Sequence, residues 1–525
     1  MHAAENICIL LCVVAGLVIV ARKFALPYPV VLVTAGLILG FTPGPPAAVR
    51  LVPEVFFFFV LPPLIYPAAL VTSWRDFRRN LPIILLLATG LVVTTMFVVA
   101  LVAHHFIPAL PWGSALALGA IVSPTDTIAA TTVIRRLAVP HRIEAILEGE
   151  SLVNDATGLV ALQFAVVAVM TGGFSLANAT LQFVLVSLGG TAVGLVVGFG
   201  NRWLQRHLDD PPVQITVSLL TPFAAYLSAE RLHVSGVLAA VAAGMFVGWH
   251  SPVTLSARTR LQASAFWEMI VFLLNGFIFI VIGLQLPEIL GTLHGIAPSA
   301  LAGYAAAVCG AVIGVRVGWA LLGTSFARVI PVFSGFIPPG RHVFLIAWAG
   351  MRGVISLAAA FALPLALPDG RPFPGRNYIL FLTFCVIFVT LVLQGLTLPL
   401  AIRALRIRDD GLLEEEERRA RLEANTAALQ YLDRAIADGA SKSIAERLRA
   451  EYDDRLEELR ACADRSGEDH GGGIAIGEFQ HLQQEALRVE RQTIVRLRNE
   501  LVINDEALRR IQRDLDLAEA RLAGE

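Results

Sequence analysis

The first 404 residues alternate between long apolar stretches and short polar ones. A helix needs roughly 17–25 apolar residues to cross about 30 Å of hydrocarbon, and about thirteen stretches have that length. They cover residues 6–22, 28–42, 50–71, 81–104, 113–137, 141–171, 180–203, 212–230, 234–250, 262–287, 298–326, 341–366 and 376–404. We therefore predict an all-α polytopic membrane protein with about thirteen transmembrane helices.

Two of these stretches contain a polar interruption. The fifth is apolar up to Val122 and then reads Ser123-Pro-Thr-Asp-Thr127, where the proline removes a backbone donor and should break the helix. The twelfth carries Gly350-Met-Arg-Gly353 at its middle. Interrupted segments at corresponding positions of two halves are typical of inverted-repeat transporters whose site lies where the broken helices cross. We predict inverted repeats and two discontinuous crossing helices.

The chain changes character near Arg403, after which Glu, Arg, Asp and Ala dominate. This shift predicts a membrane domain over 1–404 and a polar helical region over 405–525. Helices are expected at about 412–437, 443–463 and 478–523, with a break at Gly471–Gly473 between the last two. No heptad is sustained. The polar region could regulate the membrane domain, stabilise a dimer or be an inert appendage.

Composition and loop charge support this reading. Hydrophobic residues make up 56% of the chain and charged residues 16%, and the net charge of −1 gives no indication of nucleic-acid binding. The five cysteines lack the spacing of a zinc site or a disulfide framework. Basic residues concentrate in alternate loops, which predicts that the N-terminus lies outside and the polar region in the cytoplasm. Examples are Arg22, Lys23, Arg75, Arg78, Arg79, Arg135, Arg258 and Arg260.

The sixth stretch contains an acidic segment, Glu148–Asp155, where the surroundings suit lipid. A charge at the bilayer centre costs about 2.5–3.5 kcal/mol even on the most lenient scale, so such residues are functional candidates. Ser151 and Asp155 are four residues apart, as are Glu150 and Asn154, so two polar stripes lie on one side of a helix. Glu144 and Glu148 are expected nearer the interface.

The chemistry of this segment suits a monovalent cation or a proton. A carboxylate, a hydroxyl and carbonyls freed at Pro124 are hard oxygen ligands, and divalent chelation would call for more carboxylates. Nearby histidines and thiolates, which transition metals prefer, are missing from the sequence here. Arg352 needs an anion, for which Glu150, Asp126 and Asp155 are the candidates. The partner of Arg316 cannot be named from the sequence.

Three motifs in order make the chain recognisable. Ser123-Pro-Thr-Asp126, Leu147-Glu-Gly-Glu-Ser-Leu-Val-Asn-Asp-Ala156 and Trp348-Ala-Gly-Met-Arg-Gly-Val-Ile-Ser-Leu357 closely resemble the sodium/proton exchangers of the cation:proton antiporter-1 family, especially its bacterial members. The resemblance covers nearly all of residues 6–404. It implies that Asp155 is the essential aspartate that binds either cation or proton.

The resemblance also assigns roles to the neighbours of Asp155. Ser151 and the backbone carbonyl of Thr125 would be Na+ ligands together with Asp155. Asn154 would go with electroneutral one-for-one exchange, and Asp126 matches the acidic residue of the broken helix.

Two further implications concern residues around this site. Glu150 and Arg352 would form a structural ion pair. Pro67 departs from the pattern, because many relatives have an acidic residue in this region of the third stretch that completes the coordination through water. This departure leaves ion preference and affinity open.

We therefore predict a secondary antiporter, and not an enzyme, that exchanges Na+, or Li+ or K+, for H+ by alternating access. It would lie in the inner membrane of a bacterial cell, require no cofactor beyond the transported ions, and form a homodimer. A K+-preferring antiporter and a cation channel are the alternatives. Glycines spaced by four occur in the seventh and eleventh stretches, at Gly190, Gly194, Gly198, Gly310, Gly314 and Gly318, and indicate close packing within one chain or across a dimer.

Overall fold

The computed structural model describes residues 2–24, 26–42, 53–135, 137, 139–171, 176–293, 295–329 and 339–464, with a few positions between 487 and 517. The predicted break at Gly471–Gly473 and most of the predicted helix at 478–523 lie outside these residues, as do positions 50–52 of the third stretch. The chain divides into two compact units, Met1–Asp410 and Gly411–Glu525.

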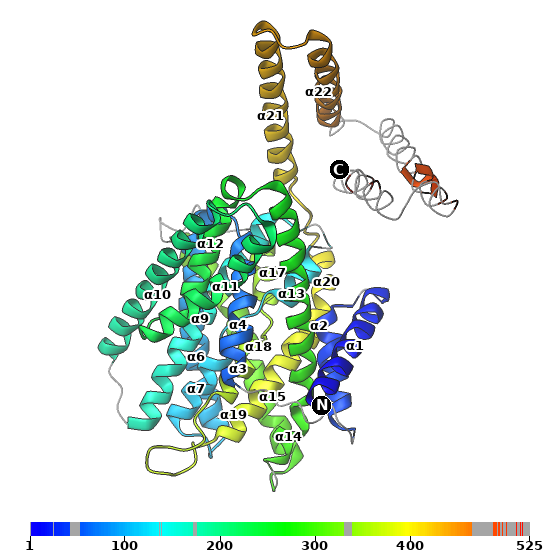
Figure 1. Cartoon of the computed structure of the whole chain (residues 1–525). Coiled ribbons are helices and arrows are strands. Elements are labelled where there is room, and N and C mark those ends of the chain that lie inside the picture. The colour runs from blue at the N-terminus through cyan, green and yellow to red at the C-terminus, as the bar shows by residue number, and fades with distance from the viewer. Residues whose placement is uncertain are drawn as a thin grey trace. The chain divides into compact units, whose positions relative to one another are not determined.

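The described part of the first unit is helical (Figure 1). Its N-terminal half comprises α1 (His2–Lys23), α2 (Tyr28–Gly40), α3 (Pro53–Val55), η2 (Phe56–Val60), α4 (Leu61–Val71), α5 (Trp74–Leu85), η3 (Leu86–Leu91), α6 (Val92–Phe106), α7 (Trp112–Val122), α8 (Ile128–Ile134), α9 (His141–Thr171) and α10 (Leu176–Gln205). The remaining elements are α11 (Pro211–Arg231), α12 (Gly236–Thr254), α13 (Ala257–Leu284), α14 (Leu286–Gly291), α15 (Pro298–Val329), α17 (Gly340–Trp348), α18 (Val354–Phe361), α19 (Arg376–Val389), η4 (Thr390–Gln394) and α20 (Gly395–Ala404).

Each of the thirteen predicted stretches coincides, where it is described, with a helix or with consecutive helical segments. The all-helical prediction is confirmed, and the two interruptions separate α7 from α8 and α17 from α18. Among the described residues, seven helical segments are long and apolar enough to cross a bilayer alone. The total of thirteen crossings stays a prediction.

The third stretch deviates from a regular helix before its prolines. Pro62, Pro63 and Pro67 predict a kink in the helix after the Phe56–Phe59 run, and the structure has a π-helical turn, η2, over that run. Pro62 and Pro63 then occupy the first turn of α4, where a missing backbone donor costs little, and Pro67 lies inside that helix.

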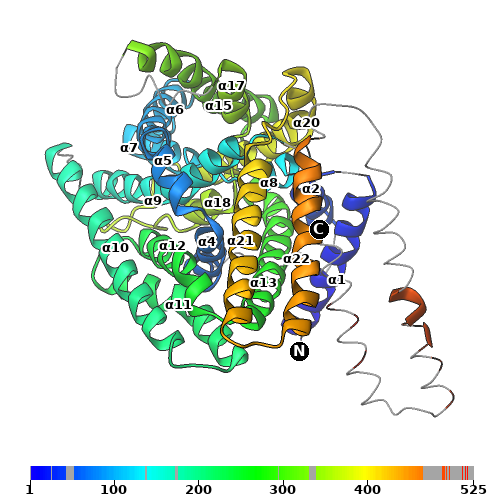
Figure 2. The ribbon, with the colours of Figure 1, turned by 90° about the horizontal axis from the view of Figure 1, so that it is seen from above.

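The helices of the first unit gather in two groups around a central layer (Figure 2). Seen from above, α5, α6, α7, α15 and α17 lie on one side, and α4, α10, α11 and α12 lie on the other. Between them lie α9 and α18, with the two interruptions. The acidic segment is therefore enclosed on both sides, although it belongs to a single helix.

The two glycine series have different surroundings. A Cβ on Gly194 would overlap the backbone of Ala239, and one on Gly190 would overlap Ser235, so this series seats α10 against α12 within the chain. At Gly310, Gly314 and Gly318 of α15 a Cβ would meet nothing within 4 Å. The first series therefore packs inside the protomer, and the second faces open space.

The second unit contains the helices α21 (Leu412–Ala437) and α22 (Lys442–Asp464), as the sequence predicted for this part of the chain. The connection between them includes Gly439, whose positive φ of 96° suits glycine. Arg449 and Asp433 form an ion pair across the two helices at 2.5 Å. The described part of this unit is thus a helical hairpin.

Candidate functional site

The two interruptions meet in the middle of the first unit. The backbone N–H of Asp126 donates to the carbonyl of Met351 at 2.8 Å, which joins the first break to the second. Gly353 makes this approach possible, because a Cβ there would overlap the Asp126 carboxylate. A Cβ on Gly350 would likewise overlap the guanidinium of Arg316. The glycines of the twelfth stretch therefore make room for charged side chains.

Arg352 lies at the crossing and is completely buried. Its Nε donates to the carbonyl of Val122 at 2.9 Å, and its Nη1 donates to the carbonyl of Gly350. These carbonyls lie at the C-terminal ends of α7 and just beyond α17, where the helix dipoles favour a positive charge. The guanidinium thus satisfies backbone groups that the two breaks leave free.

One face of α9 is fastened to the first break through Thr125. Ser151 Oγ donates to the Thr125 carbonyl at 3.1 Å, and Asn154 Nδ2 donates to Thr125 Oγ1 at 2.8 Å. Thr125 Oγ1 in turn donates to Glu150 Oε1 at 3.0 Å. The helical spacing predicted that these α9 side chains share one side, and the structure brings them to the break.

The predicted ion pair between Glu150 and Arg352 is wrong in its partner. Glu150 is bound on both oxygens by Arg316 of α15, with Nη1 to Oε1 at 2.5 Å and Nη2 to Oε2 at 2.9 Å. Both side chains are almost completely buried, and Arg316 also donates to the carbonyls of Ile346 and Ala347. Arg316 therefore links α9, α15 and the end of α17. Its position within a long apolar stretch was the only signal in the sequence.

Asp155 has a different environment from Glu150, one and a half turns away on the same helix. Its side chain is buried, with 8% of the residue exposed. Across the described ranges it has neither a hydrogen bond nor an ion pair, and Asp126 is a neighbouring carboxylate. A buried carboxylate without a protein partner must take up a proton or bind a cation.

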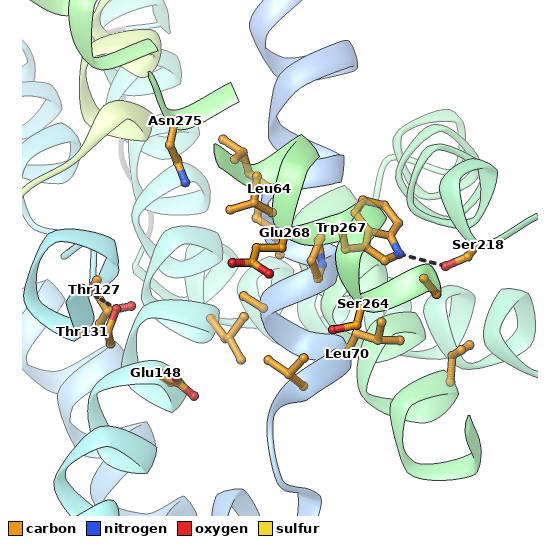
Figure 3. Close-up of a pocket in the computed structure, with 18 of the residues that line it drawn as sticks. Leu64, Leu70, Thr127, Thr131, Glu148, Ser218, Ser264, Trp267, Glu268 and Asn275 are labelled. Atoms are coloured by element: carbon orange, nitrogen blue, oxygen red, sulfur yellow. Dashed lines mark hydrogen bonds between the residues drawn. The ribbon is translucent and has the colours of Figure 1, made fainter. Parts of the chain in front are cut away.

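Asp155 lines a cavity of about 590 Å³, part of whose lining is shown in Figure 3. Ser151 and Asp126 line it together with Asp155. Thr125 and Asn154 are buried behind this lining. Of the five residues predicted to bind cation or proton, three therefore line the cavity, and the other two support the residues that line it.

The opposite side of the cavity is built by α4, α11, α12 and α13. Pro67 and Ala68 belong to this wall and offer no side-chain oxygen, so the residue that departs from the family pattern does line the cavity. Glu268 of α13 projects into the cavity in Figure 3, which places it in the vestibule that leads to Asp155. Beside it, Trp267 Nε1 donates to Ser218 Oγ at 3.1 Å.

The mouth of the cavity carries a small ion-pair network. Arg135 binds Glu144 at 2.5 Å and Glu148 at 3.0 Å. Both glutamates were expected near the interface, and Glu148 also lines the cavity. No group of three or more His, Cys, Asp or Glu side chains that could hold a metal ion occurs in the part of the chain described here.

A helical bundle with two crossing broken helices, and a cavity ending at a buried carboxylate, defines a multi-pass membrane transport protein. Residues 9–404 match the family described as sodium/hydrogen exchanger, transmembrane. The chain belongs to this family, and the resemblance seen in its sequence motifs is confirmed.

Relatives and a solved structure agree with this assignment. An uncharacterized Na+/H+ exchanger of Mycobacterium tuberculosis is 36% identical, with 97% of this chain and 94% of the relative covered. A sodium, potassium, lithium and rubidium/H+ antiporter of Bacillus subtilis is 35% identical over 78% of this chain and 62% of its own. The sodium proton antiporter MjNhaP1 of Methanocaldococcus jannaschii matches in fold, with a TM-score of 0.58 at 18% identity, covering 77% of this chain and 99% of that one.

Proposed function

We propose that the protein exchanges a monovalent cation, Na+ foremost, for a proton, and that Asp155 binds either one. The observation that supports this role is the buried Asp155 carboxylate, which lacks a protein partner in the described structure and faces the cavity. Proton and cation compete for the same oxygen atoms. Each neutralises the charge that is costly to keep in a low-dielectric site.

Ser151 and the Thr125 carbonyl are the proposed companions of Asp155 in holding the cation. The Ser151 hydroxyl donates to the Thr125 carbonyl at 3.1 Å, so rotation of the hydroxyl hydrogen away from the carbonyl would free a lone pair on each oxygen for an ion. All three ligands are hard oxygen donors, which suit Na+. No other cofactor is proposed, because the transported ions supply the chemistry.

Transport would proceed by alternating access. The cavity is lined at its open end by Arg135 and Arg260, which belong to loops predicted to be cytoplasmic, so this structure would be open to the inside. The site would move only when Asp155 is neutral, since an uncompensated carboxylate is costly to carry through an apolar barrier. Exchange would be electroneutral, with one cation for one proton on a single carboxylate beside the uncharged Asn154.

We also propose a membrane location and an oligomeric state for the protein. The loop charges support an orientation with the N-terminus outside and the second unit in the cytoplasm. The resemblance to bacterial members of the family supports a place in the bacterial inner membrane. A homodimer is proposed on the family resemblance and can be tested by cross-linking in native membranes. K+ transport is the second candidate, favoured by the name of the Bacillus subtilis relative.

The experiment that tests the function is exchange in everted vesicles with Na+, Li+, K+ and Rb+ across pH. The wild-type rate should be bell-shaped in pH, because protons compete with the cation at low pH and become limiting at high pH. Asp155→Asn, which keeps the size of the side chain, should abolish exchange. Asp209→Asn, an exposed aspartate outside the cavity lining, is the control. Cation-dependent proton movement that survives Asp155→Asn, or uncoupled flux at channel rates, contradicts the proposal.

A further inference from the structure

Helix α13 presents one stripe of side chains to the cavity. The stripe includes Ser264, Trp267, Glu268, Val271 and Asn275, whose spacing of three and four residues places them on one helical face. At a rise of 1.5 Å per residue, Asn275 lies about 10 Å deeper along the helix than Glu268. Glu268 is exposed to solvent and Asn275 is completely buried, so the stripe runs from the solvent-exposed part of the cavity to its buried end. Both side chains are labelled in Figure 3.

The amide of Asn275 is chemically unsatisfied in the described structure. The residue has 0% exposure, and neither Nδ2 nor Oδ1 has a hydrogen-bond partner there. The Tyr28 hydroxyl of α2 lies close enough to interact with the Asn275 amide, although the two groups do not form a well-aligned hydrogen bond. Each unpaired buried polar atom costs roughly 1–3 kcal/mol. The Tyr28 hydroxyl can engage only one of the two amide atoms, so the other calls for a partner that the protein itself does not supply.

The part of the cavity wall that α4 forms offers no side-chain oxygen atom to a cation. Asp155, Ser151 and Asp126 provide oxygen atoms on one wall. On the opposite wall the lining residues of α4 are apolar and include Pro67. Asn275 therefore brings a polar group from the α13 side to the deep end of the cavity that the carboxylates face.

We propose that Asn275 is a ligand of the transported cation, with Oδ1 completing the coordination from the wall opposite Asp155. This inference rests on the proposed function. An amide carbonyl is a neutral hard oxygen ligand, so it holds Na+ without adding charge and leaves one-for-one exchange intact. A protonated Asp155 leaves Asn275 without its ion. The residue therefore raises cation affinity and leaves proton binding to the carboxylate.

The test compares three substitutions at this position in the full chain. Asn275→Leu keeps the approximate size and removes both polar atoms, and Asn275→Ala removes the side chain without adding bulk. Each should raise the apparent KM for Na+ in everted vesicles about tenfold and leave kcat nearly unchanged. Asn275→Asp adds a charged oxygen at the same point and should lower the KM for Na+.

The matched control is Asn201→Leu. Asn201 is a buried asparagine of α10 that donates to Thr221 and is not part of the cavity lining, so its loss should leave the KM for Na+ unchanged. A KM within twofold of wild type in Asn275→Leu and Asn275→Ala overturns the inference. If neither of these folds, Asn275→Asp decides, and an unchanged KM in that variant overturns it.

A binding measurement separates this inference from the proposed function. Na+ should raise the melting temperature of the purified wild-type protein, and Asn275→Leu or Asn275→Ala should need about tenfold more Na+ for the same rise. Wild-type vesicles without exchange would contradict the antiporter function, and Na+-dependent stabilisation would still report on Asn275. Normal exchange with an unaltered Na+ response in the variants contradicts only the role of Asn275.

Discussion

The two helix breaks share a backbone device and use it for opposite charges. The first, between α7 and α8, carries Asp126, and the second, between α17 and α18, carries Arg352. Each charge lies at a helix end belonging to the other break. Arg352 binds the Val122 carbonyl at the end of α7, and the Asp126 carboxylate lies against Gly353 at the start of α18. Both placements agree with the helix dipoles.

The difference between the breaks lies in access to the cavity. Asp126 is partly exposed and lines the cavity, whereas Arg352 is completely buried behind it. The same contrast separates Asp155, which faces the cavity, from Glu150, which is held by Arg316. An intramembrane charge that reaches the cavity is available to ions, and one that is enclosed by donors or carbonyls holds helices together.

The largest effect is expected from separating Glu150 and Arg316. Glu150→Gln or Arg316→Met alone should destabilise the protein by about 3–5 kcal/mol, because each leaves a buried charge without its partner. The double variant should be less destabilised than the sum of the two. Thermal unfolding in detergent measures this coupling. If Glu150→Gln couples to Arg352→Met and not to Arg316→Met, the pairing described here is wrong.

Gly353→Ala should have the next largest effect, because the new Cβ would overlap the Asp126 carboxylate and push the two breaks apart. We expect exchange in vesicles to fall by more than about tenfold, as ångström-scale displacement of functional groups commonly costs more than that. Gly310→Ala on α15, where a Cβ would meet nothing within 4 Å, is the matched control and should behave as wild type. Equal rates in the two variants would show that the crossing tolerates the extra atom.

A smaller effect is expected from Glu268→Gln in the vestibule. Glu268 is exposed to the cavity and carries a charge that attracts cations before they reach Asp155. Its loss should raise the apparent KM for Na+ by about threefold at low ionic strength, and choline chloride should reduce the difference through screening. A kcat that falls at every salt concentration would instead indicate a role beyond attraction.

The smallest effect is expected from a glutamate–arginine pair on the solvent-exposed surface of the second unit. Hydrogen bonds from Arg418 and Arg419 lower the pKa of Glu415 on α21 to about 2. The stabilisation is therefore present above the ordinary carboxylate pKa and is lost as the pH falls toward 2. Glu415→Gln should change the melting temperature of the full chain by less than about 1 °C at pH 7, because exposed pairs contribute little. A large shift would mean that this glutamate is not solvated.

The sequence predicted most of the helical architecture from pattern alone. Apolar stretches of membrane-spanning length leave a chain few alternatives in lipid, since every backbone polar group must be paired within its own helix. Pro124 and the glycines around Arg352 predicted the breaks, because they interrupt or weaken this helical hydrogen bonding. The four-residue spacing of Ser151 and Asp155 likewise placed both on one helix face, which the structure turns toward the cavity.

The pairing of charges could not be predicted from the sequence. Glu150 could pair with either of two arginines in apolar stretches, Arg316 or Arg352. Sequence separation carries no information about which of these two side chains reaches it. Packing of α15 against α17 brings Arg316 to Glu150, while the carbonyls left free at the breaks retain Arg352.

What the sequence determined by itself is therefore local: the helices, their breaks and the polar face of α9. The tertiary structure alone decided which polar groups are satisfied and which face the cavity. Asn275 illustrates the division, because it reads as one polar residue in an apolar helix until the fold places it, unpaired, on the cavity wall. The physical reason is that helix formation depends on neighbours in the chain, whereas desolvation and pairing of a charge or an amide depend on neighbours in space.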